Sequence, residues 1–146
     1  MALEIREIEF AEYDAAAEVV WSSFRHLAAQ YQSAAGIEQF KQFAQASEIR
    51  ARDAAGGCCW VALIQNTVIG VLQTRADAHI ALLFVLPEFQ SRGVGRALVK
   101  AADSKQKLQS VNASVNSVGA YMRYGFMPVG AEQVKAEIRF VPMKRN

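Results

Sequence analysis

Residues 89–98, FQSRGVGRAL, combine two glycines with two arginines directly after a nearly apolar segment. Gly93 and Gly95 allow the backbone to curl and a bulky group to approach, while Arg92 and Arg96 add positive charge. If a helix begins here, its first N–H groups lack internal acceptors and its dipole favours an anion. The pattern indicates either a phosphate-binding turn or a tight strand–helix turn with surface arginines.

Two well-known phosphate motifs do not fit this turn. The dinucleotide fingerprint needs a third glycine three residues after Gly95, where this chain has Leu98. The nucleotide P-loop needs a Gly-Lys-Ser/Thr sequence, which the chain lacks. Any phosphate bound here would therefore be held by a different kind of loop.

The elements around the turn follow from the hydrophobic pattern. Residues 79–85, HIALLFV, are apolar at successive positions, which predicts a central strand buried on both faces. Val94 and Leu98 begin an amphipathic stripe that predicts a helix after the turn. Upstream, CCWVALI and VIGVLQT are joined by residues 65–67, which predicts an antiparallel hairpin.

The rest of the chain supplies further helices and strands. We expect a first strand near residues 3–10, a helix over residues 14–29 capped by Asp14, and a chain break at Gly36. The other predicted elements are a helix over 37–52, a strand over 108–114, a short helix over 116–125 and final strands over 126–130 and 136–143. The order β-α-α-β-β-β-α-β-α-β-β predicts an α+β fold in a single domain, residues 1–146.

Composition excludes several classes of protein. The formal net charge of +2 is too small to indicate a nucleic-acid partner. No apolar run approaches the roughly 20 residues that a membrane span needs, and the N-terminus lacks a signal-peptide core. Cys58 and Cys59 are adjacent, so the sequence predicts neither a disulfide framework nor a metal site, and we expect a reducing cytoplasm.

Two motifs together resemble one family. Residues 90–95 read Q-x-x-G-x-G, which resembles the pyrophosphate loop of the GCN5-related N-acetyltransferases, the GNAT superfamily. Residues 111–126, VNASVNSVGAYMRYGF, resemble that family's fifth strand and following helix, and IRFVPMKR resembles the last strand of many members. The predicted order of elements also matches, so the resemblance covers nearly the whole chain.

The resemblance implies a fold and an activity. The fold would be a mixed sheet of six to seven strands, with strands 4 and 5 splayed apart, flanked by about four helices. The activity would be direct transfer of an acetyl group from acetyl-CoA to a primary amine of a small molecule or peptide, without a metal. A non-catalytic acyl-CoA sensor and an acetylating toxin that acts on aminoacyl-tRNA remain alternatives, and a homodimer is left open.

The resemblance also assigns roles to residues. Tyr121 would be the general acid that protonates the departing CoA thiolate, with a core aromatic as the alternative. Asn116 would bond the pantetheine arm or cap the helix, and pantetheine would pair with the strand backbone before the turn. The implied acetyl-CoA contacts are Phe84, Val85, Gln90, Ser91, Arg92, Gly93, Val94, Gly95, Arg96 and Asn116.

The base and the acceptor wall are less specific in sequence. Some family members use a carboxylate about eleven residues before the loop glutamine, and that spacing reaches His79 here. A histidine suits a base at neutral pH, although a structural hydrogen bond would explain it equally well. Phe24, Tyr31 and Phe40 could line the acceptor side or could form a helix–helix corner.

Overall fold

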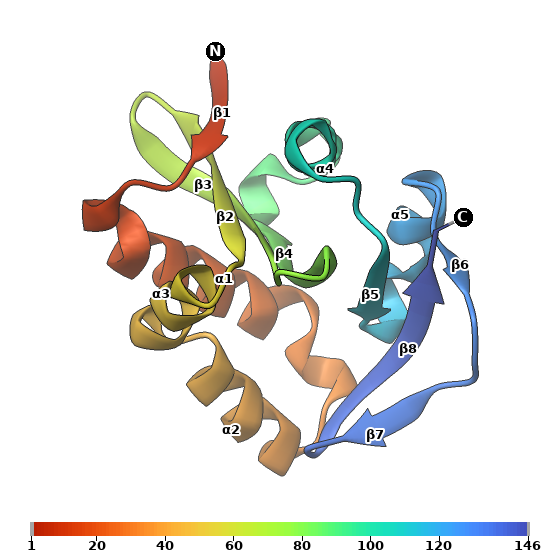
Figure 1. Ribbon diagram of the computed structural model, residues 1–146. Helices are drawn as coiled ribbons and strands as arrows, with labels where there is room; N and C mark the ends of the chain where they lie inside the picture. Colours follow the sequence, from red (N-terminus) through yellow and green to blue (C-terminus); the bar gives the residue numbers. More distant parts are fainter. Residues whose placement is uncertain (1, 146) are drawn as a thin grey trace.

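The computed structural model describes residues 2–145 and is built on one mixed sheet in the order β1-β2-β3-β4-β5-β8-β6, with β7 paired to β8 (Figure 1). Of the strand pairs in this described region, β4 and β5 run parallel and the others antiparallel. The strands are β1 (Leu3–Glu7), β2 (Cys58–Ile64), β3 (Thr67–Thr74), β4 (His79–Val85), β5 (Ser110–Ala113), β6 (Met127–Pro128), β7 (Gln133–Lys135) and β8 (Ile138–Lys144).

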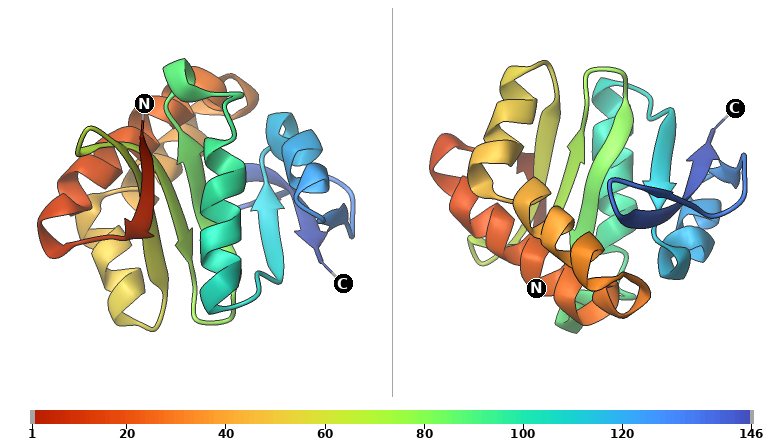
Figure 2. Two further views of the ribbon diagram at one scale, coloured as in Figure 1. Left: turned by 90° about the horizontal axis from the view of Figure 1, so that it is seen from above. Right: turned by 90° about the horizontal axis from the view of Figure 1, so that it is seen from below.

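Helices cover both faces of the sheet (Figure 2). One face carries α1 (Tyr13–Leu27), α2 (Ala34–Phe43) and α3 (Ala46–Ala54), and the other carries α4 (Val94–Lys105) and α5 (Val118–Arg123). Short 3₁₀ turns occur at Phe10–Glu12, Ala29–Tyr31, Pro87–Phe89 and Val115–Ser117. The mixed sheet between helices confirms the predicted fold, and residues 2–145 contain eight strands and five α-helices.

Each face of the sheet has its own hydrophobic core. Under α1 and α2, Val20 and Phe24 are buried against strand residues such as Val71. Under α4 and α5, Leu98 and Phe126 are fully buried. The amphipathic stripes of α1 and α4 thus bury their apolar sides, as the spacing predicts.

The second predicted helix, residues 37–52, is wrong in its extent. The chain instead forms α2 and α3, separated by a turn at Ala44 and by Gln45, whose extended backbone precedes α3. The predicted break at Gly36 is also wrong, because Gly36 lies within the first turn of α2. Its N–H donates to the Ser33 hydroxyl at 3.0 Å, so Ser33 is the N-cap.

Two hairpin turns set the strand boundaries. Gln65 and Asn66 have φ values of 51° and 62°, as the two central residues of a tight hairpin require. Ala136 and Glu137 form a similar turn, with φ values of 51° and 68°. The last strand therefore begins at Ile138 rather than at residue 136. The sequence pattern does not predict β7, and Asp14 is not the cap of α1, which begins at Tyr13.

The sheet opens between β4 and β5. The two strands pair only at His79 with Ser110 and at Ile80 with Val111. The pairing of β3 with β4 skips Ala81, which marks a bulge where the opening begins. Beyond Ile80, β4 therefore presents a free edge toward β5, which confirms the predicted splay of these strands.

Candidate functional site

The turn after β4 exposes a row of backbone donors. Ser91 and Gly93 have positive φ values of 62° and 83°, which curl the chain into the start of α4. The first helical bond runs from the Ala97 N–H to the Gly93 carbonyl at 3.0 Å. Within residues 2–145, no N–H group of residues 91–96 has a protein acceptor. We call these six N–H groups the amide cradle, and their arrangement suits an anion.

The two glycines of the loop serve different purposes. Gly93 has a left-handed backbone, and a Cβ added there would meet no atom within 4 Å. At Gly95, by contrast, a Cβ would lie 2.6 Å from the hydroxyl oxygen of Tyr124. Gly93 is thus needed for its conformation and leaves open space, while Gly95 allows a side chain from α5 to approach.

Gln90 holds the loop onto the end of β4. Its Nε2 donates a 2.7 Å hydrogen bond to the carbonyl oxygen of Val85. The side chain of the first residue in the Q-x-x-G-x-G motif is therefore engaged within the protein. Gln90 therefore shapes the loop from inside.

The free edge of β4 offers backbone groups from alternate residues. The Leu86 N–H donates to the Ile69 carbonyl at 2.9 Å, which fixes the alternation along the strand. The backbone groups of Phe84 consequently point toward β3, and those of Leu83 and Val85 point toward β5. The expectation that the Phe84 backbone faces the opening is therefore corrected to Leu83, because pairing register decides the direction.

Tyr121 lies on α5 with its ring in the core. The side chain is 7% exposed and packs perpendicular to Tyr124 and Phe126, with ring centroids 6.1 Å and 5.8 Å away. Within residues 2–145 the Tyr121 hydroxyl makes no hydrogen bond to a protein group. Burial raises the pKa of Tyr121, and the neighbouring Tyr124 adds to this rise.

His79 lies at the start of β4, where β4 and β5 are still paired. It is half-buried, and its Nδ1 lies 2.8 Å from the Ser110 hydroxyl on β5. Burial lowers the pKa of His79 below 6.5, and the charge of Arg75 lowers it further. The imidazole is therefore neutral at pH 7 and has one ring nitrogen outside the Ser110 bond.

Comparison with known proteins now decides the family. Residues 28–146 match the model of the acetyltransferase (GNAT) domain. The chain belongs to the GNAT acetyltransferase family. A curated relative, the uncharacterised N-acetyltransferase YafP of Escherichia coli K12, is 33% identical over 99 residues, which are 67% of this chain and 65% of the relative. The match thus spans slightly less than two thirds of that protein.

Solved structures share the fold of this GNAT chain. A GCN5-related N-acetyltransferase from Rhodopseudomonas palustris superposes with a TM-score of 0.85 at 18% identity, covering 100% of this chain and 96% of the other. PaiA N-acetyltransferase from Thermoplasma acidophilum, solved with coenzyme A, gives a TM-score of 0.75 at 20% identity and 100% coverage of both chains. At these identities, the likeness establishes the common architecture.

Asn116 joins two parts of the GNAT fold. Its Nδ2 donates to the Leu27 carbonyl at the end of α1 at 3.1 Å, and its Oδ1 accepts from the Ser114 hydroxyl at 2.7 Å. Both ends of the amide are thus engaged within the protein. It makes no side-chain bond that caps α5, so its observed role is to connect α1 with the segment after β5.

The aromatic residues expected at the acceptor side are mostly core residues. Phe24 and Phe40 stack with centroids 4.0 Å apart and are 3% and 8% exposed. Phe84 packs against both rings. Tyr31 is 37% exposed, so it alone of the three predicted acceptor residues presents substantial surface. The next residue, Gln32, exchanges hydrogen bonds of 2.9 and 2.8 Å with the Arg139 backbone on β8.

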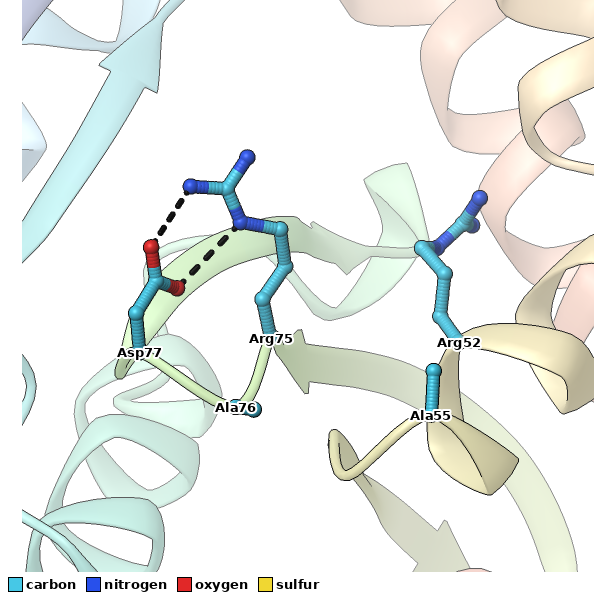
Figure 3. A pocket seen from close by; sticks show the side chains of 5 residues that line it. All are labelled: Arg52, Ala55, Arg75, Ala76 and Asp77. Carbon is cyan, nitrogen blue, oxygen red and sulfur yellow. Dashed lines mark hydrogen bonds and ion pairs between the residues drawn. The ribbon is translucent and has the colours of Figure 1, made fainter.

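Two surface pockets lie outside this constellation. One, of about 320 Å³, is lined by Arg52, Ala55, Arg75, Ala76 and Asp77 at the β3–β4 turn, the opposite end of β4 from the amide cradle (Figure 3). The Arg75–Asp77 ion pair of 2.8 Å lies at this turn. The other, of about 600 Å³, lies between α2, α3 and the β7–β8 turn. Neither is lined by a cradle residue.

Within residues 2–145, no three His, Cys, Asp or Glu side chains are grouped so that they could hold a metal ion. None of the helices in that region combines the length and apolar character needed to cross a membrane.

Proposed function

We propose that this GNAT chain is an acetyl-CoA-dependent N-acetyltransferase whose acceptor is a primary amine of a small molecule or peptide. The observation that carries the proposal is the amide cradle, which lies at the end of the free edge of β4. A pyrophosphate needs several convergent donors, and an extended amide-bearing arm needs an open strand edge. In this chain the open edge of β4 leads directly to the cradle, just as the pantetheine arm of acetyl-CoA is joined to its pyrophosphate.

The described residues fit the co-substrate. The cradle would hold the pyrophosphate, and the Leu83 backbone groups and the Val85 N–H would be offered to the pantetheine amides, since the Val85 carbonyl already accepts from Gln90. Arg92 and Arg96 add charge beside the cradle, where their guanidinium groups lie over Phe89 and Tyr124 at 5.7 Å from each ring centroid. Exposed arginines near a phosphate site strengthen binding mainly at low ionic strength.

The chemistry assigns a proton donor to the thiolate side. Acetyl-CoA supplies an activated acyl group, and attack by a neutral amine forms the C–N bond as the C–S bond breaks. Tyr121 would give its hydroxyl proton to the departing sulfur. The hydroxyl is protonated at neutral pH, as a proton donor must be, and the pKa raised by burial makes it a weaker acid than a free phenol, so close placement beside the sulfur must carry the transfer. The same tyrosine would then recover a proton from solvent.

The amine must lose a proton, and His79 is the proposed acceptor of that proton. Its lowered pKa keeps the imidazole neutral at neutral pH, and Ser110 fixes the orientation of the ring. A base working through one water molecule would meet the same requirement. Tyr31, as the exposed aromatic near the end of α1, is the proposed contact for the acceptor.

Binding can be tested with a matched pair of variants at Gly93. Both Gly93→Asn and Gly93→Asp place a side chain of one shape in open space, but only Asp adds negative charge. We expect calorimetry to show weak or absent acetyl-CoA binding for Gly93→Asp, and at least about tenfold tighter binding for Gly93→Asn, at low salt. Equal affinities for the two variants would show that no anion binds at the cradle.

Turnover separates the enzyme from a sensor. Free-thiol release should be measured against polyamines, amino acids, aminoglycosides and peptides with free N-termini or lysines. With the amine that reacts, Tyr121→Phe should lower kcat by about 100-fold while the acetyl-CoA Kd stays within about threefold. Tight binding with no turnover on any amine would favour the non-catalytic sensor instead.

A further inference from the structure

Tyr124 connects the amide cradle with the proposed acid. Its hydroxyl oxygen lies beside Gly95, only 2.6 Å from the point where the Cβ of any larger residue would be. The guanidinium group of Arg96 lies over the Tyr124 ring at 5.7 Å. The tip and face of one side chain from the end of α5 thus contact the first turn of α4.

The same ring also holds Tyr121. The Tyr121 and Tyr124 rings are perpendicular, at 89°, and their centroids lie 6.1 Å apart. The Phe126 ring also packs edge to face against Tyr121, with a centroid distance of 5.8 Å. Edge-to-face contacts of this kind favour particular ring orientations. Tyr121 is therefore oriented by two aromatic neighbours, of which Tyr124 is the one that also touches the cradle.

The backbone of Tyr124 is fixed as firmly as its side chain. Arg145 donates from Nε and Nη2 to the Tyr124 carbonyl at 3.1 and 2.9 Å. The same guanidinium group binds the Asp103 carboxylate on α4 at 2.7 and 3.0 Å. The end of α5 is thus tied to α4 near both ends of that helix, at Gly95 and at Asp103.

We propose that Tyr124 is a positioning residue, which sets the distance and orientation of the Tyr121 hydroxyl relative to the amide cradle. The proposal rests on the proposed function, because it concerns a donor molecule held by the cradle at one end and protonated by Tyr121 at the other. Rigid spacing matters here, since a small displacement of a reacting group lowers the rate strongly. Tyr124 acts through Tyr121 and the cradle and need not touch the reacting atoms.

A double-mutant cycle tests the coupling. Gly95→Ala places a methyl group against the Tyr124 hydroxyl, and we expect kcat to fall at least about tenfold as Tyr124 and Tyr121 shift. Tyr124→Phe removes the hydroxyl, and the nearest remaining ring atom then lies 3.7 Å from the added methyl group, which is ordinary contact. The double variant should therefore recover most of the kcat lost in Gly95→Ala. A loss of the same size in both backgrounds would overturn the proposal.

A second variant distinguishes positioning from simple stability. Tyr124→Leu removes the ring and should lower kcat at least about tenfold, with the acetyl-CoA Kd within about threefold. Met122→Leu, at an exposed site on the same helix, is the control and should leave kcat unchanged. If Tyr124→Leu lowers only the melting temperature and leaves kcat at the wild-type value, Tyr124 is structural and the proposal fails.

An activity-independent measurement keeps this proposal separate from the proposed function. Thermal unfolding should show that Gly95→Ala lowers the melting temperature in the wild-type background and much less in the Tyr124→Phe background. If the wild-type chain acetylates no amine but this pattern holds, the function fails while the coupling stands. If the effects of Gly95→Ala and Tyr124→Phe on the melting temperature are additive, the coupling fails whatever the activity.

Discussion

The Gln90 Nε2 donates a 2.7 Å hydrogen bond to the Val85 carbonyl oxygen, and so the loop residue of the Q-x-x-G-x-G motif braces the last residue of β4. This bond spans five residues and turns the chain back toward the strand edge. It fixes the start of the loop that carries the cradle to the end of β4. The motif glutamine therefore shapes the loop that we propose as the anion site.

Replacing Gln90 by Glu should weaken acetyl-CoA binding. The carboxylate cannot donate to the Val85 carbonyl and adds negative charge near the cradle, so we expect the Kd to rise about tenfold. Calorimetry would measure this change. Gln106→Glu, the same substitution at an exposed position beyond the other end of α4, is the control. An equal effect of both substitutions would mean that the Gln90 bond does not shape the site.

Gly36→Ala should destabilise the contact between α2 and the β7–β8 turn. An added Cβ would lie 2.5 Å from the backbone oxygen of Glu137, so one of the two segments must move. We expect the free energy of unfolding to fall by about 1–3 kcal/mol, as for other overpacked sites, and urea denaturation would measure it.

Gly119→Ala is the matched control for Gly36→Ala. Gly119 lies in α5, and an added Cβ would approach only the Arg123 side chain, at 3.8 Å. Alanine is a better helix former than glycine, so this variant should be neutral or more stable by up to about 1 kcal/mol. Equal destabilisation by both substitutions would contradict the close approach at Gly36.

Arg145→Lys should lower stability by about 2–3 kcal/mol, because lysine cannot reproduce the paired bonds to Asp103 and the Tyr124 carbonyl. The Arg145 side chain is only 12% exposed, so water would compensate poorly for the lost partners. Urea denaturation at neutral pH measures the effect. A change below about 0.5 kcal/mol, typical of surface sites, would show that the cluster contributes little.

The Asp103–Arg145 pair also predicts how stability depends on pH. Burial acts to raise the pKa of Asp103, but the bonds from Arg145 and the Leu108 N–H outweigh it and lower the pKa below 3.8. The resulting stabilisation is present above pH 3.8 and is lost as pH falls through the folded-state pKa. Asp103→Asn should therefore flatten the decline of the urea midpoint in this acidic range. An unaltered slope would count against the pair.

Substitution of His79 should change the acidic side of the activity profile. With the pKa of His79 below 6.5 in the folded chain, loss of its neutral form should reduce kcat/KM only below that pH. His79→Gln should lower kcat/KM at neutral pH by about 100-fold and remove this limb. Ser110→Ala, which keeps the imidazole but removes its 2.8 Å partner, should retain the limb. A profile and turnover unchanged in His79→Gln would show that another group is the base.

Contiguous features of the site could be predicted from sequence. Local sequence signals are enough to predict the strand before the loop, the glycine turn and the following helix. These signals are the spacing of apolar residues and the backbone conformations that glycine allows. The structure accordingly has β4, Gly93 with positive φ and the start of α4 where the pattern placed them. The motif around Tyr121 likewise predicted a short helix ended by Gly125, whose φ is 96°.

Other features depend on partners that are distant along the chain. The backbone oxygen of Glu137 leaves no room for a Cβ at Gly36, and the Tyr124 hydroxyl leaves none at Gly95. The Leu27 carbonyl accepts a hydrogen bond from Asn116. In each case the partners are too far apart in the sequence for a local pattern to reveal the contact. Strand register, fixed by the bond between Leu86 and Ile69, decided which backbone groups of β4 face the opening.

Sequence by itself thus determined which local conformations this chain adopts and which segment could bind an anion, because backbone dihedrals and hydrophobic periodicity act over a few residues. Only the tertiary structure decided what each side chain contacts, since those contacts form when segments far apart in sequence pack together. The amide cradle belongs to the first class. The coupling of Gly95, Tyr124 and Tyr121 belongs to the second, because it exists only where α4 and α5 meet.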